Sequence, residues 1–254
     1  MLNILLTGVG GQGTVLAAKV LAQAALEKGW QVRTAETIGM AQRGGNVVSH
    51  VRIGNKGEQV HAPLVSRGTA DLIIAFEPAE AARVLPYLAP AGTLVFATTA
   101  VQPVTAALSK NPYRASDVIA NMERALAGTQ ANLVPVDDAA LTKAAGSRKV
   151  LNSLLLAKAL QTGCVPINVE DLRAAIAACV KPRFVDMNLQ AINVAVGEKH
   201  RKTLHCKQRD RKSVPLPVLG VACGLVWPTM TSMTSVFDIH FSSAARIALA
   251  GRWL

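Results

Sequence analysis

A glycine-rich segment near the N-terminus has residue types and a spacing that suit phosphate binding. Residues 8–13 read Gly-Val-Gly-Gly-Gln-Gly, follow an apolar run and precede residues with helical periodicity. Glycines here let backbone N–H groups approach a pyrophosphate, while the next helix adds the partial positive charge of its N-terminus. We therefore predict a cofactor-binding loop made of Gly8, Gly10, Gly11, Gln12, Gly13 and Thr14. The alternative is that these glycines bind no ligand and only allow the helix to pack closely on the strand.

A second glycine-rich segment, residues 39–45, carries one cation and reads GMAQRGG. In a parallel sheet it would lie beside the first loop at the carboxyl edge, where open α/β sheets bind ligands. An arginine among glycines suits phosphate recognition, and a tight turn with an exposed arginine is the alternative. The predicted site therefore also includes Gln42, Arg43, Gly44, Gly45 and, in the strand that follows, Ser49.

Three polar residues alternate along the strand that follows this second loop. Ser49 should face one side of the sheet with Val51, while His50 and Arg52 face the other. A lone histidine on a strand is more often packed than a ligand, so we expect His50 to be structural. Arg52 is a candidate for pairing with a partner subunit.

Two carboxylates flank the start of a helix near residue 78. Glu77 follows an apolar strand, and Pro78 suits the first turn of a helix. The helix dipole alone favours Glu77 there, so we expect a capping or interface role, and an exposed position for Glu80. The sequence identifies no catalytic residue.

The elements that must position these loops follow from the apolar pattern. Compact apolar runs predict strands over residues 2–9, 31–36, 47–53, 71–76, 93–97 and 132–136. Helical periodicity alternates with them over residues 14–28, 78–88 and 117–127. The predicted buried face of the first helix consists of Val15, Ala18, Leu21, Ala22 and Ala25. Turn chemistry at residues 54–57 predicts that residues 58–61 pair back as a hairpin.

This alternation predicts an α/β fold, a Rossmann-like three-layer domain with a mostly parallel sheet. Helices over residues 150–160, 169–180 and 183–196 should cap the sheet. The character changes after Gly197, to a basic run and then a mixed segment rich in Pro, Ser and Thr. We predict a domain over residues 1–196 and a tail over 197–254. The tail reads as a disordered, solvated run, with a frame-shifted C-terminus as the alternative.

The net charge of +11 raises the question of a nucleic-acid partner. More than half of the excess lies in the tail, whose basic run contains no aromatic residue, so we expect no nucleic acid. The cysteines are far apart and no apolar run reaches membrane-spanning length, which favours a cytoplasmic protein without a membrane partner. The spacing of His200, His205 and Cys206 fits no closed zinc pattern, so we predict no metal site.

Several motifs in this order resemble one known family. They are GVGGQG, GMAQRGG followed by VVSHVRIG, ADLIIAFEPAEAARVLPYL, and KVLNSLL, and they span residues 1 to about 196. Together they resemble the γ-type domain of pyruvate and other 2-oxoacid:ferredoxin oxidoreductases, in particular the small subunits of the indolepyruvate type.

The resemblance implies a reaction in which a 2-oxoacid and coenzyme A yield an acyl-CoA, carbon dioxide and two electrons for ferredoxin. It implies a large α subunit that carries thiamine diphosphate, magnesium and 4Fe-4S clusters. The electrons would pass to ferredoxin through that subunit. The chain has no Cys-x-x-Cys pair, in keeping with this division. On its own it should be inactive.

In pyruvate-type relatives the equivalent loops resemble a coenzyme A phosphate site. The resemblance maps this site to residues 10–14 and to Arg43, although those relatives carry paired lysines where this chain has Gln42 and Arg43. Two other functions remain open. One is a nicotinamide-dependent dehydrogenase in which Glu36 holds the ribose. The other is a purely structural subunit whose glycine loops and exposed helix 154–160 form an interface.

Overall fold

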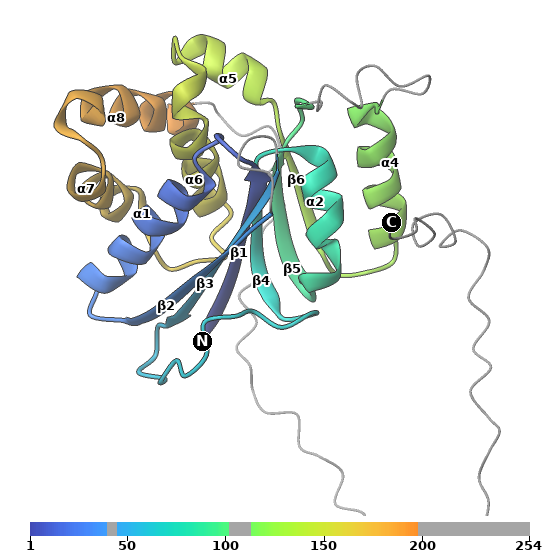
Figure 1. Cartoon of the computed structure of the whole chain (residues 1–254), viewed down its shortest axis with the longest axis horizontal. Helices are drawn as coiled ribbons and strands as arrows, with labels where there is room; N and C mark the ends of the chain where they lie inside the picture. Colours follow the sequence, from blue (N-terminus) through green and yellow to red (C-terminus); the bar gives the residue numbers. More distant parts are fainter. Residues whose placement is uncertain (40–44, 102–112, 198–254) are drawn as a thin grey trace, which may run out of the picture. The chain divides into compact units, whose positions relative to one another are not determined.

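The computed structural model describes residues 1–39, 45–101 and 113–197. Within them, one sheet has the strand order β2-β3-β1-β4-β5-β6 (Figure 1). The strands are β1 (Leu2–Val9), β2 (Gln31–Ile38), β3 (Asn46–Gly54), β4 (Ala70–Ala75), β5 (Leu88–Ala97) and β6 (Asn132–Val136). β1, β4, β5 and β6 are mutually parallel, and β3 is antiparallel to both of its neighbours. The predicted mostly parallel sheet is confirmed.

The centre of the sheet is buried on both faces. Leu5 of β1 pairs with Ile73 of β4, which pairs in turn with Leu94 of β5, and all three side chains are fully buried. Strands buried on both faces read as continuous apolar runs rather than as an alternating pattern. This is why the sequence predicts β1 and β4 to within one residue, whereas β5 begins at Leu88, five residues before its predicted start and where a helix was predicted to end.

β3 occupies a place that the sequence did not predict. It pairs with β1 along one edge and with β2 along the other, so neither edge is free for residues 58–61. The predicted hairpin is therefore wrong, and residues 58–61 form no strand. The carbonyl oxygen of Val60 instead accepts a hydrogen bond from Arg33 Nε at 3.4 Å. β2 is parallel to β1 but separated from it by β3.

Helices cover both faces of the sheet, which confirms the three-layer arrangement (Figure 1). The first face packs against α1 (Thr14–Glu27), α5 (Asp138–Ala144), α6 (Leu151–Gln161), α7 (Val169–Cys179) and α8 (Pro182–Gly197). The second face packs against α2 (Pro78–Val84) and α4 (Ala115–Leu126). Short 3-10 turns, η1 (Leu85–Tyr87) and η2 (Arg148–Val150), precede β5 and α6.

α6 is the most deeply buried of these helices. Every residue from Leu151 to Leu160 is buried, because α6 packs on β4 and β5 and is enclosed by α1, α5, α7 and α8. Leu and Ala make up most of this helix, as expected in such a place, and Asn152, Ser153 and Lys158 are buried with them. The exposed helix at residues 154–160 that the structural-subunit alternative required is therefore wrong.

The helical C-terminal part ends at the last described residue. α7 begins at a capping box in which the Asn168 side chain accepts from Asp171 N and the Asp171 side chain accepts from Asn168 N. α8 ends at Gly197, and the predicted tail after it lies outside the described residues. Across the described ranges, none of the helices combines the length and apolar character needed to span a membrane.

Candidate functional site

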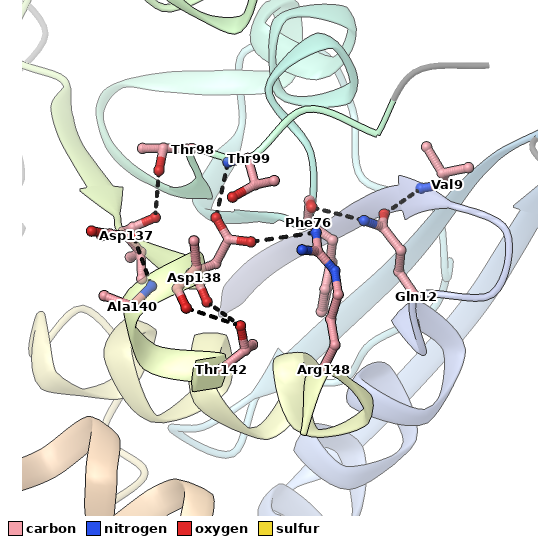
Figure 2. A network of polar contacts seen from close by, with 12 residues as sticks. Val9, Gln12, Phe76, Thr98, Thr99, Asp137, Asp138, Ala140, Thr142 and Arg148 are labelled. Carbon is pink, nitrogen blue, oxygen red and sulfur yellow. Dashed lines mark hydrogen bonds and ion pairs between the residues drawn. The ribbon is translucent and has the colours of Figure 1, made fainter. Parts of the chain in front are cut away.

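The carboxyl ends of β1 and β4 mark the point where the chain changes from one face of the sheet to the other. β1 leads into α1 on the first face, whereas β4 leads into α2 on the second. The two strands are parallel neighbours, with Thr7 opposite Ala75. Open α/β sheets bind ligands in the crevice outside such a switch point. The segments that follow β1 and β4 therefore frame the candidate site (Figure 2).

The glycines after β1 have different roles. A Cβ on Gly8 would lie 2.9 Å from Phe76 Cβ, so this position requires glycine for packing. Gly13 has a φ of 84°, and a Cβ there would lie 3.2 Å from Nδ2 of Asn152 in α6. Gly11 has a φ of 101°, and a Cβ there would meet no described atom within 4 Å. Of these three glycines, Gly11 faces open space.

Gln12 braces the loop onto the end of β4. Its Oε1 accepts from Val9 N at 2.7 Å, and its Nε2 donates to the carbonyl oxygen of Phe76 at 3.0 Å (Figure 2). Both ends of the amide are thus used within the chain. The structure gives the Gln12 side chain a role in shaping the loop.

Replacing Gln12 with Glu is expected to lower the free energy of unfolding by about 1 kcal/mol. The carboxylate of Glu still accepts from Val9 N. Its second oxygen cannot donate to the Phe76 carbonyl and instead faces that carbonyl oxygen, so two acceptors repel each other. Gln130→Glu, at an exposed position, is the matched control and should change stability little. Urea unfolding of the full chain measures both variants. Equal shifts in their midpoints would contradict the bracing role.

α1 begins at this loop without a side-chain cap. Its N-cap residue is Gly13, and the first-turn amides have no acceptor within the helix. Thr14 is 3% exposed, and its Oγ1 lies 3.0 Å from where a Cβ of Gly8 would be. That hydroxyl has no hydrogen-bond partner among the described residues. What α1 offers a ligand is therefore its backbone amides, with the Thr14 hydroxyl beneath the loop.

An open hollow of about 460 Å³ adjoins the loop. Its lining is mostly apolar and consists of Val9, Gly11, Gly13, Thr14, Val15, Leu16, Lys19 and Val47. Val15 is 39% exposed here, so its predicted place in the buried face of α1 is wrong. The buried face turns instead toward Ala17, Leu21 and Ala24, which leaves Val15 at the hollow.

The two glycine-rich segments meet, as predicted. Gly10 N donates to the carbonyl oxygen of Gly45 at 2.8 Å, and Gly39 N donates to that of Asn46 at 2.9 Å. The end of the second segment therefore lies beside the first, and its beginning is held to the start of β3. Its other predicted site residues, Gln42, Arg43 and Gly44, lie outside the described residues.

The polar residues of β3 face opposite sides, as expected. Ser49 is fully buried, and its hydroxyl has no hydrogen-bond partner among the described residues. His50 Nδ1 accepts from Val65 N at 3.2 Å, and burial lowers the pKa of His50. Arg52 Nε donates to Asn3 Oδ1 at 3.0 Å. His50 is thus a packed residue, and Arg52 has contacts within its own chain.

Glu77 caps α2, as expected, but the expectation for Glu80 is wrong. The Glu77 carboxylate accepts from Glu80 N at 3.0 Å and from the Tyr113 hydroxyl at 2.8 Å. Glu80 is buried, with an exposed fraction of only 6%. Burial raises the pKa of Glu80, and its ion pair with Arg83 at 3.3 Å opposes this shift. The short α2 packs its first turn against its neighbours, which buries Glu80.

Sequence reasoning missed a polar cluster at the carboxyl ends of β5 and β6. Asp138 is 1% exposed, and its Oδ1 accepts from Thr99 N at 2.9 Å. Its Oδ2 lies 3.6 Å from Nη2 of Arg148; Figure 2 marks this ion pair. The available signal was the pair of acids Asp137 and Asp138 directly after a predicted strand. Strand ends at this edge are where ligand-contacting groups gather.

The nicotinamide alternative required Glu36 near the glycine loop. Glu36 pairs with Ser49 across β2 and β3, and Ser49 pairs with Leu6 of β1. The intervening strand places Glu36 about 10 Å from β1, two strand spacings instead of one. This geometry disfavours a ribose contact by Glu36 from a ligand on the loop.

The described part of the chain contains no group of three or more His, Cys, Asp or Glu side chains arranged to hold a metal ion. Neither Cys164 nor Cys179 forms a disulfide with another described residue.

Comparisons with known proteins agree with this architecture. The solved γ subunit of a keto/oxoacid ferredoxin oxidoreductase from Geobacter sulfurreducens PCA is 20% identical. Its TM-score is 0.55, with 78% of this chain and 97% of that one covered. The 2-oxoglutarate:ferredoxin oxidoreductase from Magnetococcus marinus, solved with 2-oxoglutarate, coenzyme A and succinyl-CoA, is 17% identical. Its TM-score is 0.57, and the match covers 77% of this chain and 30% of that one. These similarities show the fold.

Sequence comparison shows the family. The indolepyruvate oxidoreductase subunit IorB of Archaeoglobus fulgidus is 36% identical over 199 residues, which covers 78% of this chain and 94% of that protein. The model of the family described as pyruvate ferredoxin/flavodoxin oxidoreductase matches residues 3–198. The chain belongs to the pyruvate ferredoxin/flavodoxin oxidoreductase family.

Proposed function

We propose that this chain is the small subunit of a CoA-dependent 2-oxoacid:ferredoxin oxidoreductase, and that its glycine loop binds the diphosphate of coenzyme A. One observation carries the loop assignment. The uncapped N-terminus of α1 and the open face of Gly11 lie together at the switch point of the sheet. Uncapped helix N-termini next to glycines favour phosphate groups.

The overall reaction converts one 2-oxoacid anion and one coenzyme A into acyl-CoA, carbon dioxide and a proton, with two electrons passed to ferredoxin. The name of the A. fulgidus relative makes indolepyruvate or a similar aryl pyruvate the favoured oxoacid. The proposed partner is a large subunit that holds thiamine diphosphate, magnesium and 4Fe-4S clusters. This chain then contributes to binding and orienting coenzyme A rather than to redox chemistry.

The described residues fit such a ligand. The first-turn amides of α1 supply donors for phosphate oxygens, and Lys19 adds a cation at the hollow beside them. The apolar lining by Val15, Leu16 and Val47 suits the uncharged part of a nucleotide ligand. Arg43, which the sequence predicts to pair with a phosphate, would add a charge-assisted contact worth about 1.5–3 kcal/mol. The likeness to the CoA-bound M. marinus enzyme supports the same ligand.

Gly11→Ala in the assembled enzyme is expected to raise the KM for coenzyme A at least about tenfold, which corresponds to about 1.4 kcal/mol. The added methyl enters the open face where the diphosphate is proposed to lie. Steady-state oxidation of the oxoacid with a redox dye measures this KM.

Gly128→Ala is the matched control for backbone strain. Gly128 has a φ of 83° and, like Gly11, open space at its Cβ position, but it follows α4 far along the chain from the loop. Its substitution should leave the KM for coenzyme A unchanged. An unchanged KM in Gly11→Ala as well would favour the structural-subunit alternative.

A further inference from the structure

A buried carboxylate holds a half-exposed arginine at the same edge of the sheet. Asp138 is 1% exposed, and one of its oxygens is fixed by Thr99 N at 2.9 Å. The other oxygen has no hydrogen bond among the described residues and lies 3.6 Å from Arg148 Nη2. The Arg148 side chain is 52% exposed. The carboxylate therefore holds the guanidinium from one side and leaves another side open to solvent.

Arg148 lies close to the glycine loop. Asn152, four residues later at the start of α6, contacts the loop where a Cβ of Gly13 would be 3.2 Å from its Nδ2. Arg148 opens the 3-10 turn η2, which runs directly into α6 and so leads to Asn152. Arg148 therefore precedes that contact by four residues along the chain, and its partner Asp138 follows β6 at the carboxyl edge of the sheet. In Figure 2 its side chain extends toward Asp138, in the direction of Phe76 at the end of β4.

The chemistry of this pair suits recognition of a second anionic group. A guanidinium has five N–H donors in a fixed planar fork, of which a carboxylate uses two at most. The remaining donors match the oxygens of a phosphate, and the carboxylate restricts the rotamers of the long side chain. About half of the Arg148 side chain, 52%, is exposed at this edge and so is accessible to a ligand.

We infer that Arg148 binds a phosphate group of the nucleotide ligand and that Asp138 is the positioning residue that orients it. The inference rests on the proposed function, because the ligand is the coenzyme A assigned to the glycine loop. Coenzyme A carries phosphate in its diphosphate and in its 3′-phosphate. The two sources share one chemistry, and dephospho-CoA, which lacks the 3′-phosphate, separates them.

The test is calorimetric titration of the assembled enzyme with coenzyme A and with dephospho-CoA, without oxoacid. Arg148→Ala should raise the Kd for coenzyme A about 10- to 100-fold, the range for a lost charge-assisted contact. Arg148→Lys, which keeps the charge but not the fork, should fall in between. Lys149→Ala removes the adjacent exposed cation and is the matched control for net charge, with an expected Kd close to that of the unsubstituted enzyme.

Asp138→Asn keeps an acceptor for Thr99 N but removes the charge that holds Arg148. It should raise the Kd for coenzyme A a few-fold, and it should add nothing in a double variant with Arg148→Ala. Such non-additivity is the expected sign of two residues acting as a unit. Fully additive effects would contradict the positioning role.

The ligand series separates the remaining outcomes. If Arg148→Ala weakens coenzyme A but not dephospho-CoA, Arg148 binds the 3′-phosphate; if it weakens both equally, Arg148 binds the diphosphate. An unchanged Kd of Arg148→Ala for both ligands would overturn the inference. The proposed function would still stand if Gly11→Ala raised the KM for coenzyme A as expected. An unsubstituted enzyme that binds no coenzyme A would instead contradict the proposed function itself.

Discussion

Replacing Leu155 with Ala in α6 is expected to lower the free energy of unfolding of the full chain by about 2–5 kcal/mol. Leu155 is fully buried at the centre of a helix that is enclosed on all sides. The substitution removes apolar contacts and leaves a cavity that its neighbours fill only in part. Urea unfolding monitored by circular dichroism measures the change.

Leu26→Ala is the matched control, because it is the same substitution in a helix on the same face of the sheet. Leu26 is 53% exposed in α1, so its replacement should change stability by no more than about 0.5 kcal/mol. If the two variants lost similar stability, α6 would not be the core helix that the structure shows. It would then be available as an interface helix in the assembled enzyme.

Gly8→Ala is expected to lower the free energy of unfolding by about 1–3 kcal/mol. The methyl would lie 2.7 Å from Gln12 Oε1, 2.9 Å from Phe76 Cβ and 3.0 Å from Thr14 Oγ1, and of these the Phe76 Cβ cannot move without its backbone. Relief of these contacts must therefore shift β1 against β4 or α1. Because those elements frame the loop, the variant should also bind coenzyme A more weakly in the assembled enzyme.

Gly197→Ala at the end of α8 provides the control for this prediction. Gly197 has open space at its Cβ position and no left-handed backbone strain. Alanine there should leave stability within about 0.5 kcal/mol. A Gly8→Ala chain as stable as the Gly197→Ala chain would mean that the first glycine of the motif is not needed for close packing.

The fold was predictable wherever burial leaves a local pattern. β1, β4 and the second half of β5 are buried on both faces and therefore appear as compact apolar runs, and the half-buried edge strand β6 keeps a short one. The position of β3 was not predictable, because strand pairing depends on partners far apart in the sequence. The sequence places β3 next to β2 but cannot show that its other edge is filled by β1. The many Leu and Ala residues of α6 indicated burial, but the burial of Lys158 with them was not predictable.

In the candidate site, too, features with a local sequence signal were predictable and features that depend on distant partners were not. The glycine loop was predictable because its signal lies in one short segment between a strand and a helix. The role of Gln12 was not, because its partner Phe76 lies 64 residues away. Asp138 and Arg148 are separated by α5 and meet only when η2 returns to the edge of the sheet. A local sequence pattern therefore cannot predict this ion pair.

The central claim is that this chain acts as the small subunit of a 2-oxoacid:ferredoxin oxidoreductase. Its most direct test is co-purification of the tagged full chain from its host, followed by assay of oxoacid oxidation with coenzyme A and a redox dye. We predict recovery of a large iron–sulfur protein and an activity that requires thiamine diphosphate, coenzyme A and both chains. A chain recovered alone that binds NADH, or a complex whose activity does not depend on coenzyme A, would contradict the claim.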